Sequence, residues 1–112
     1  MTLTVQKQSE ELLLIQLDGS LDLPGTREIE TSFLAYVASA KESVIVDLSR
    51  VSFLASFGMR MIFDATKSLA RKGKKLVVLK PQPSVAKVLE LGGLTEVAII
   101  SYEEEDARRQ VA

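Results

Sequence analysis

The first half of the chain contains two segments with the hydrophobic pattern of strands, followed by one with the pattern of a helix. Leu3–Gln8 alternates weakly between apolar and polar residues, and Leu12–Leu17 is an apolar run bounded by acidic residues, so both are predicted strands. Pro24 suits the first turn of a helix, where its missing amide proton costs nothing. This helix is predicted to end near Lys41, with apolar residues along one face at three- and four-residue spacing. They are Ile29, Phe33, Tyr36 or Val37, and Ala40.

The next segments continue the alternation of strands and helices. Ser43–Leu48 is a β-branched apolar run, typical of a central strand that is covered on both faces. After a linker at Ser49–Ala55, a helix is predicted over Ser56–Arg71, with Gly73 as its carboxyl-terminal stop. The following predicted elements are a strand at Leu76–Leu79, a helix at Ser84–Leu91 and a strand at Val97–Ile100.

The end of the chain has the charge pattern of a short helix. Ser101 and Glu104 have the spacing of a capping box, and acidic residues precede Arg108 and Arg109, as the helix dipole favours. Strands separated by single helices imply crossover connections and a mainly parallel sheet, while the first two strands can pair antiparallel. We therefore expect an α/β fold in a single domain over residues 1–112, with a mixed, mostly parallel sheet of four or five strands. Most helices should pack on one face, and the first strand should lie at the edge.

Composition narrows the chemistry that the chain can carry. It contains no cysteine and no histidine, which excludes a disulfide, a thiolate nucleophile, an imidazole base and the usual zinc site. The 14 Lys and Arg nearly balance the 15 Asp and Glu, which argues against strongly electrostatic binding to nucleic acid or to a membrane surface. No apolar run approaches the length of a membrane span, and Met1–Glu10 lacks the form of a signal peptide. We expect a cytoplasmic protein that is not an enzyme.

Three segments of the sequence, in their order and spacing, resemble one known family. The first is the glycine-containing turn Leu17–Asp22, after the second predicted strand. The second, Val46–Gly58, joins the central strand to the following helix, and the third is Val88–Leu94, with a glycine pair that ends its helix. Together they resemble the STAS family, the domain of bacterial anti-sigma factor antagonists and of sulfate transporter tails. The resemblance covers nearly the whole chain.

The resemblance implies an interaction module without catalysis of its own. In the best understood members, the unmodified domain binds an anti-sigma factor that is also a Ser/Thr kinase, and phosphorylation by this kinase breaks the complex. The implied switch motif is Asp, Ser or Thr, Ser or Thr, then Gly, with the phosphate on the residue before Gly. Here the motif reads Ala55-Ser56-Phe57-Gly58. Alanine thus stands in place of the acidic residue, and Phe57 in place of the phosphorylated one.

The altered motif leaves two interpretations open for Ser56 and two for Phe57. Ser56 is either the N-cap of its helix or a phosphorylation site one position out of register. On a helical projection, Gly58 and Ile62 lie on the core-facing stripe, while Phe57 and Met61 lie on a flank. This flank is either an exposed apolar patch or a surface covered by the preceding loop or the terminal helix. Our hypothesis is that Ser56, Phe57 and Met61 bind a partner, mainly by apolar burial.

Three aspartates and one basic run are further candidates. Asp18 and Asp22 flank a turn, where Asp commonly bonds the local backbone. Asp22 is also a predicted partner contact. Asp47, at the carboxyl end of the predicted central strand, either holds the switch loop or faces a ligand crevice. No metal-ligand spacing joins the three. The run Arg71–Lys75 is interpreted as a solvated helix end that the helix dipole favours, in preference to a phosphate or nucleic-acid patch. No aromatic residues are interleaved in it to stack on bases.

We therefore predict a regulatory module that docks a kinase-type anti-sigma factor and so releases a sigma factor. One alternative is a permanent STAS-type subunit of a lipid-transporting ABC complex that contacts its ATPase, since a missing phosphorylation site suits a permanent subunit. Another is a scaffold protein of a signalling assembly, which would self-associate at low concentration. None of these functions requires a cofactor, a metal, nucleic acid or insertion into a membrane.

Overall fold

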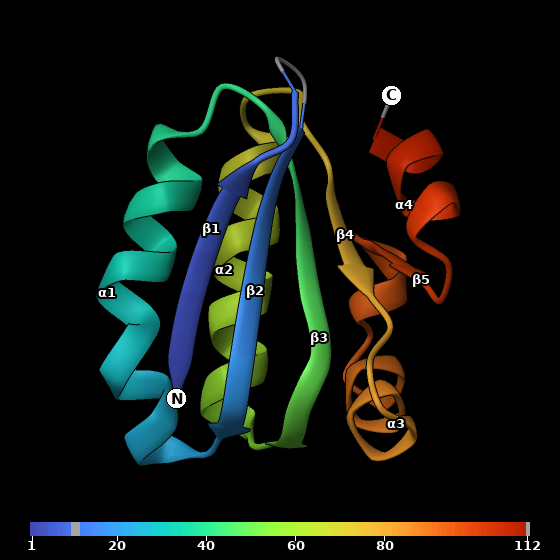
Figure 1. The fold of residues 1–112 in the computed structure, drawn as a ribbon. Helices are drawn as coiled ribbons and strands as arrows, with labels where there is room; N and C mark the ends of the chain where they lie inside the picture. Colours follow the sequence, from blue (N-terminus) through green and yellow to red (C-terminus); the bar gives the residue numbers. More distant parts are fainter. Residues whose placement is uncertain (10–11, 112) are drawn as a thin grey trace.

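Within residues 1–9 and 12–111, which the computed structural model describes, five strands form one sheet in sequence order (Figure 1). The strands are β1 (Thr2–Lys7), β2 (Leu12–Leu21), β3 (Ser43–Leu54), β4 (Leu76–Leu79) and β5 (Ile99–Ser101). Strand β1 is antiparallel to β2, and the other neighbours are parallel. The helices are α1 (Leu23–Ser39), α2 (Ser56–Ala70), α3 (Pro83–Leu91) and α4 (Glu104–Val111). The predicted mixed sheet with β1 at its edge is confirmed.

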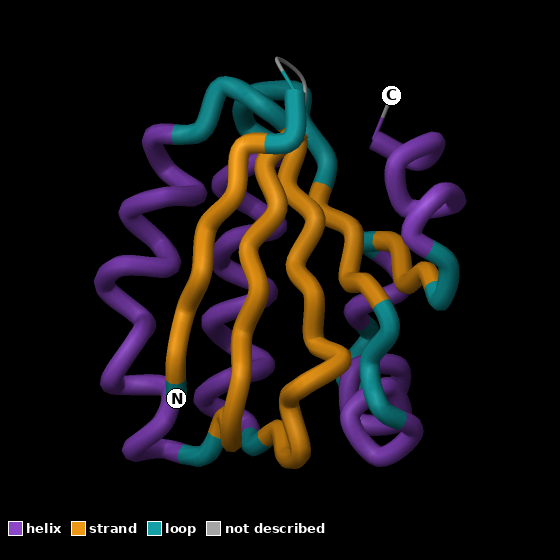
Figure 2. Tube along the Cα trace, viewed as in Figure 1, coloured by secondary structure: helices purple, strands orange, loops and turns teal. Residues whose placement is uncertain are grey.

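The helices cover the two faces of the sheet unequally. Residues of α1, α2 and α3 pack into the larger hydrophobic core, whereas Ala107 of α4 packs with a smaller cluster on the other face. Strand β3 serves both faces, because Val44 and Val46 enter the large core and Ile45 enters the small one. Figure 2 shows α1 and α2 side by side along the strands, and the two helices contact each other. The prediction of a central strand covered on both faces is thus confirmed.

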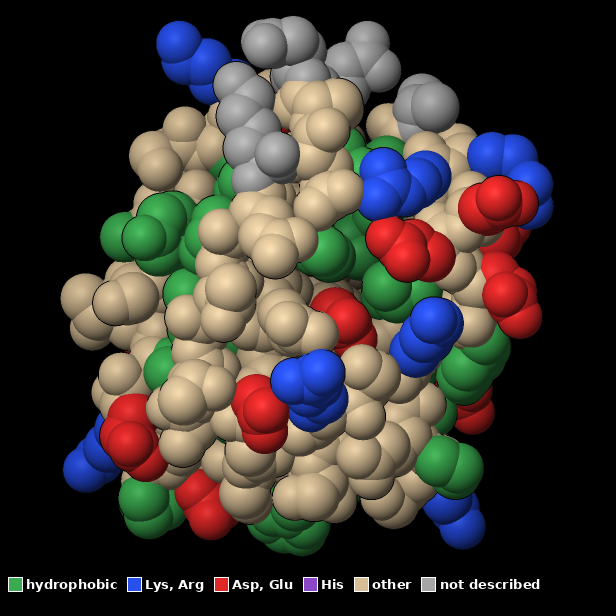
Figure 3. Space-filling model, viewed as in Figure 1, with side chains coloured by type: hydrophobic (Ala, Val, Ile, Leu, Met, Phe, Trp, Pro, Cys, Tyr) green, Lys and Arg blue, Asp and Glu red, His purple; other side chains and the backbone are tan. Residues whose placement is uncertain are grey.

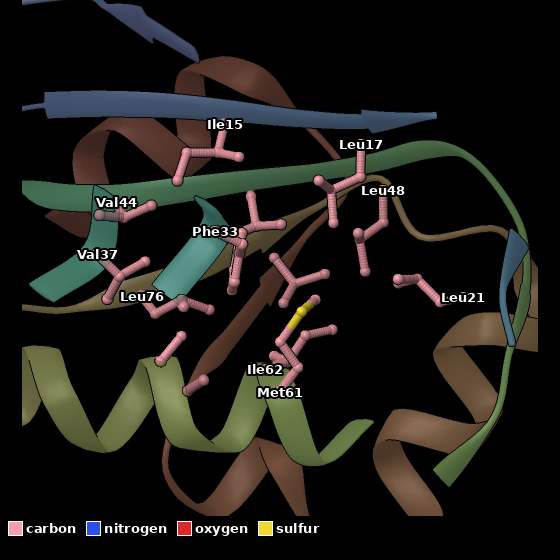
Figure 4. Close-up of a cluster of buried hydrophobic side chains, with 14 of the residues drawn as sticks. Ile15, Leu17, Leu21, Phe33, Val37, Val44, Leu48, Met61, Ile62 and Leu76 are labelled. Atoms are coloured by element: carbon pink, nitrogen blue, oxygen red, sulfur yellow. The ribbon is translucent and has the colours of Figure 1, made fainter. Parts of the chain in front are cut away.

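The large core lies between the sheet and helices α1 and α2. Figure 4 shows Ile15 and Leu17 of β2 pointing toward Phe33 of α1 and Ile62 of α2, and all four side chains are fully buried. Burying each such side chain contributes about 1.5–3 kcal/mol to folding. On β1, apolar residues that pack on this core alternate with the exposed Thr2, Thr4 and Gln6. Hydrophobic side chains accordingly occupy only scattered patches on the face that Figure 3 shows.

The predicted linker at Ser49–Ala55 is mostly strand, because β3 continues to Leu54. The last residues of β3 pair with the second half of β2. The register of this pairing shifts twice along β2, between Gln16 and Asp18 and again between Gly19 and Ser20. After Leu48 the next buried residues are therefore Val51 and Leu54, three residues apart. This spacing departs from the two-residue period of a regular strand, so the hydrophobic pattern does not reveal the extension. A 3₁₀ turn at Leu94–Glu96 was likewise not predicted.

The capping box predicted for the terminal helix does not form. Helix α4 begins at Glu104, and Ser101 is the last residue of β5. The Ser101 hydroxyl donates instead to the Asp106 carboxylate at 2.7 Å. This hydrogen bond is the largest cause that lowers the pKa of Asp106 below its ordinary value, with Arg109 adding to the effect and desolvation opposing it. Ser101 thus fixes the first turn of α4 through a side chain inside the helix.

Candidate functional site

The carboxyl ends of β2 and β3 meet the amino ends of α1 and α2 at one end of the molecule, at the bottom of Figure 1. We define the helix-start pole as residues Ser20–Leu23 and Phe53–Phe57. The two segments are joined by a hydrogen bond from the Ala55 amide to the Leu21 carbonyl, 3.0 Å long. Parallel strands with helical crossovers place these ends together, and ligands of open α/β sheets bind at this edge. The pole brings together Asp22, Ser56 and Phe57 from the predicted site.

Asp22 fixes the turn between β2 and α1. It is the N-cap of α1, and its Oδ1 accepts a hydrogen bond from the Gly25 amide at 2.8 Å. Its other oxygen accepts one from the Ser20 hydroxyl at 3.2 Å. A side-chain cap of this kind typically contributes about 1 kcal/mol. The predicted turn role of Asp22 is confirmed, and its contact with a partner stays a prediction.

Helix α2 begins without a side-chain cap. Its N-cap is Ala55, which has no side-chain oxygen, and Ser56 is the first helical residue. The interpretation of Ser56 as the N-cap is therefore wrong, because β3 runs to Leu54 and leaves only Ala55 between strand and helix. The Ser56 side chain is exposed, and its hydroxyl has no hydrogen-bond partner in the part of the chain that the structure describes.

Ala55→Asp should raise the free energy of unfolding by about 0.5–2 kcal/mol, because Ala55 already has the extended N-cap backbone and a carboxylate there can accept an unused amide hydrogen of the first turn. Urea unfolding followed by circular dichroism measures the change. Ser56→Ala is the matched control and should stay within about 0.5 kcal/mol, as exposed substitutions usually do. If Ser56→Ala lowers the free energy of unfolding by more than Ala55→Asp raises it, the cap belongs to Ser56.

Phe57 and Met61 differ in exposure, although they are one helical turn apart. The Phe57 side chain is 49% exposed, as predicted for a patch residue. Met61 is 0% exposed and lies beside Ile62 in the core (Figure 4), so its prediction as an exposed contact is wrong. The reason is that α2 packs on α1 as well as on the sheet, which widens the buried arc of the helix. The helical projection considered only one covered side.

A second exposed aromatic residue lies at the pole and was not predicted. Phe53, near the end of β3, is 53% exposed. It was overlooked because its segment was interpreted as a linker. The signal in the sequence is a phenylalanine three residues before the start of a helix, beside the buried Leu54. Exposed aromatic side chains are enriched where proteins bind one another.

The other acidic candidates have local structural roles. Asp47 accepts hydrogen bonds from the Ser49 amide at 2.9 Å and from the Gln16 amide group at 3.3 Å. Asp47 lies inside β3 and not at its carboxyl end, at the last position where β3 pairs with β4. Its two hydrogen bonds hold the irregular part of β3 that follows. Asp18 lies 3.9 Å from Arg50, and both side chains are exposed. Among the described residues no cluster of acidic side chains is suited to a metal ion.

The basic run after α2 is tied to a neighbouring helix. The Lys72 ammonium group donates to three carbonyl oxygens at the end of α1, the closest being that of Ala40 at 2.6 Å. Cations stabilise the carboxyl ends of helices because free carbonyls gather there. The run lies exposed at the carboxyl end of α2, as predicted, and its Lys72 in addition caps the end of α1. None of the helices in the described residues has the length and apolar content needed to cross a membrane.

Comparison with known sequences covers nearly all of the chain. The family model for the STAS domain matches residues 4–107. BtrV of Bordetella bronchiseptica, named as a candidate anti-sigma factor antagonist, is 26% identical over 107 residues, which are 96% of this chain and 91% of that protein. These matches agree with the resemblance noted in the sequence.

Solved structures share the fold over the same length. An anti-sigma factor antagonist from Mycobacterium paratuberculosis has a TM-score of 0.87 at 23% identity, covering 98% of this chain and 92% of the other. The antagonist SpoIIAA in its unphosphorylated form has a TM-score of 0.78 at 24% identity, covering 99% of each chain. SpoIIAA from Bacillus is also solved in its phosphorylated form. Since the family model spans residues 4–107, this chain belongs to the STAS domain family.

Proposed function

We propose that this protein is an anti-sigma factor antagonist that binds its anti-sigma factor through the helix-start pole. The observation that carries the proposal is the half-exposed Phe57 at the start of α2, directly before Gly58. Relatives that match this chain over most of its length are named as anti-sigma factor antagonists. The protein acts by binding and not by catalysis, in the cytoplasm, and needs no cofactor.

Apolar contact provides the affinity in this proposal. Phe53 and Phe57 each leave about half of the side chain exposed, so a partner that covers them gains the burial of two aromatic rings. Aromatic residues at the centre of an interface commonly cost 2 kcal/mol or more when they are removed. Asp22 and Ser56 belong to the same pole and supply the polar contacts of the proposed interface.

The binding is constitutive with respect to position 57, because phenylalanine cannot accept a phosphate. The proposed partner is an anti-sigma factor of the Ser/Thr kinase type, and Ser56 is the hydroxyl it could modify, since this side chain is exposed and unpaired within the described residues. A phosphate on Ser56 would add a charge of about −1.5 to −2 at the contact surface and weaken the complex by desolvation and repulsion.

A pull-down of the tagged protein from its native host, followed by mass spectrometry and by titration calorimetry with the recovered partner, tests the proposal. Phe57→Asp should weaken binding at least about 30-fold, which corresponds to 2 kcal/mol at an aromatic contact. Tyr102→Asp is the matched control, because Tyr102 is an aromatic residue of similar exposure outside the pole. Both variants should keep the thermal midpoint of the parent.

Recovery of an anti-sigma factor whose affinity is unaffected by Phe57→Asp would contradict the proposed docking site. Recovery of an ABC transporter ATPase with unmodified bait would instead assign the protein to the second candidate function, a permanent subunit of a transporter complex. The apolar residue at position 57 favours that candidate in one respect, because a permanent contact needs no phosphorylation site.

A further inference from the structure

A groove of about 450 Å³ runs between α1 and α2 and begins at the helix-start pole. Its walls are one face of α1 between Leu23 and Leu34 and one face of α2 between Phe57 and Asp64. Phe57 therefore belongs both to the groove and to the pole. Figures 1 and 2 show the two helices lying side by side with their starts at the same end, so positions along the two walls can be compared turn by turn.

The two walls carry the same order of charge. On α1, Arg27 is followed one turn later by Glu30, and on α2, Arg60 is followed one turn later by Asp64. Within the described residues none of the four takes part in an ion pair. Their spacing would allow pairing within each helix, as it does for Arg108 and Glu104 in α4. The groove thus presents two cations near the pole and two carboxylates one turn beyond, all four unpaired within the part of the chain that the structure describes.

A buried hydroxyl without a partner also lines the groove. The Thr26 side chain is 2% exposed, and its hydroxyl has no hydrogen-bond partner among the described residues. Thr66 on α2 is also buried, but its hydroxyl donates to the Ile62 carbonyl at 2.9 Å. Buried hydroxyl groups in folded proteins are nearly always satisfied. Because its oxygen is itself buried from solvent, this hydroxyl can reach a polar group in the groove only by rotating toward it.

We propose that this groove receives an amphipathic helix of the anti-sigma factor, and this inference rests on the proposed function. An acidic residue of that helix faces Arg27 and Arg60, and a basic residue one turn away faces Glu30 and Asp64. A helix fits because both walls are helical, so their charges repeat at the 5.4 Å of one turn. A third helix packed in the groove between two others is also a common mode of peptide recognition. An apolar side chain on the same face packs against Phe57 and extends the contact from the pole.

The test compares two double charge reversals in titrations with the anti-sigma factor recovered from the host. Arg27→Glu with Arg60→Glu should weaken binding at least about 10-fold at low salt, and the loss should shrink toward 1 M salt, where the screening length falls to about 3 Å. Lys41→Glu with Lys87→Glu changes the net charge equally at exposed sites outside the groove and should stay within about twofold of the parent.

Thr26→Val tests for a specific contact inside the groove without changing the charge of the protein. It removes the unpartnered hydroxyl without changing the shape of the side chain, so the thermal midpoint of the free protein should stay the same or rise. The partner's affinity should fall about fivefold, because the bound helix loses a hydrogen-bond partner. If Thr26→Val and the double reversal of Arg27 and Arg60 leave the affinity for the anti-sigma factor unchanged while Phe57→Asp lowers it, the groove proposal is wrong. The proposed function then still holds.

Two other outcomes are also decisive. If Phe57→Asp and the groove variants all bind like the parent, both the proposed docking site and the groove proposal fail. If sedimentation equilibrium shows a dimer of this chain that Arg27→Glu with Arg60→Glu dissociates, the groove binds a second copy and the proposed occupant is wrong.

Discussion

Replacing Met61 by alanine is expected to lower the free energy of unfolding by about 2–5 kcal/mol, the usual range for a large apolar residue that leaves a cavity. Met61 is fully buried and lies in the core between α2 and the sheet, where close packing prevents the surroundings from filling the space (Figure 4). Urea unfolding followed by circular dichroism measures the loss, and the slope with denaturant should stay unchanged.

Phe57→Ala is the matched control for Met61→Ala, since it removes a larger side chain one turn away on the same helix. Because Phe57 is half-exposed, its truncation should cost less than about 1 kcal/mol, near the range of surface substitutions. The two variants therefore distinguish a residue that stabilises the core, Met61, from a neighbouring residue that is left exposed for binding, Phe57. Equal losses in the two variants would contradict the faces that the structure gives to α2.

The regular parts of the fold could be predicted from the sequence because single elements bury continuous or evenly spaced apolar residues. Strand β4, Leu76–Leu79, is buried at every position and was predicted with its observed bounds. Helix α2 was predicted to within one residue because Ile62, Ala65 and Leu69 repeat at helical spacing and are all buried. Alternation of strands and helices then fixes the parallel connections, since crossovers between parallel strands allow few topologies.

The site could be predicted only in part, because its geometry depends on how neighbouring elements pack. Met61 was placed on the wrong face because a single helix gives no sign that α1 also covers α2. Phe53 was overlooked because the register shifts between β2 and β3 remove the two-residue period from the end of β3. The N-cap interpretation of Ser56, one of the two left open, failed because the sequence does not show that β3 runs to Leu54.

At the start of α2, Ala55 and Phe57 differ from the switch motif that the family resemblance implies, and this difference changes which forces act at the helix-start pole. A carboxylate at position 55 and a hydroxyl at position 57 would make this helix start polar and open to phosphate, which helix amino ends favour. Ala55 and Phe57 make it apolar instead, and Ser56 is left as the exposed hydroxyl. A surface of this kind binds by burial, so its affinity should depend on salt less than the charged groove beside it does.

Gly25→Ala is expected to lower the free energy of unfolding by about 3 kcal/mol or more, at or above the upper end for overpacking. A Cβ at this position would overlap the Ser20 carbonyl oxygen and come within 3.0 Å of the Asp22 carboxylate. The first of these atoms is backbone, which cannot rotate away, so the turn between β2 and α1 has to shift. Urea unfolding measures the loss.

Gly73→Ala is the control that separates this clash from the general cost of removing a glycine. Gly73 has a φ of +71° and nothing within 4 Å of an added Cβ, so alanine there meets only backbone strain of about 1–2 kcal/mol. The shift in Gly25→Ala should also displace Asp22 at the helix-start pole, and so weaken partner binding at temperatures where the variant is still folded. A loss in Gly25→Ala no greater than in Gly73→Ala would show that the turn can relax, and that it does not hold the pole in one geometry.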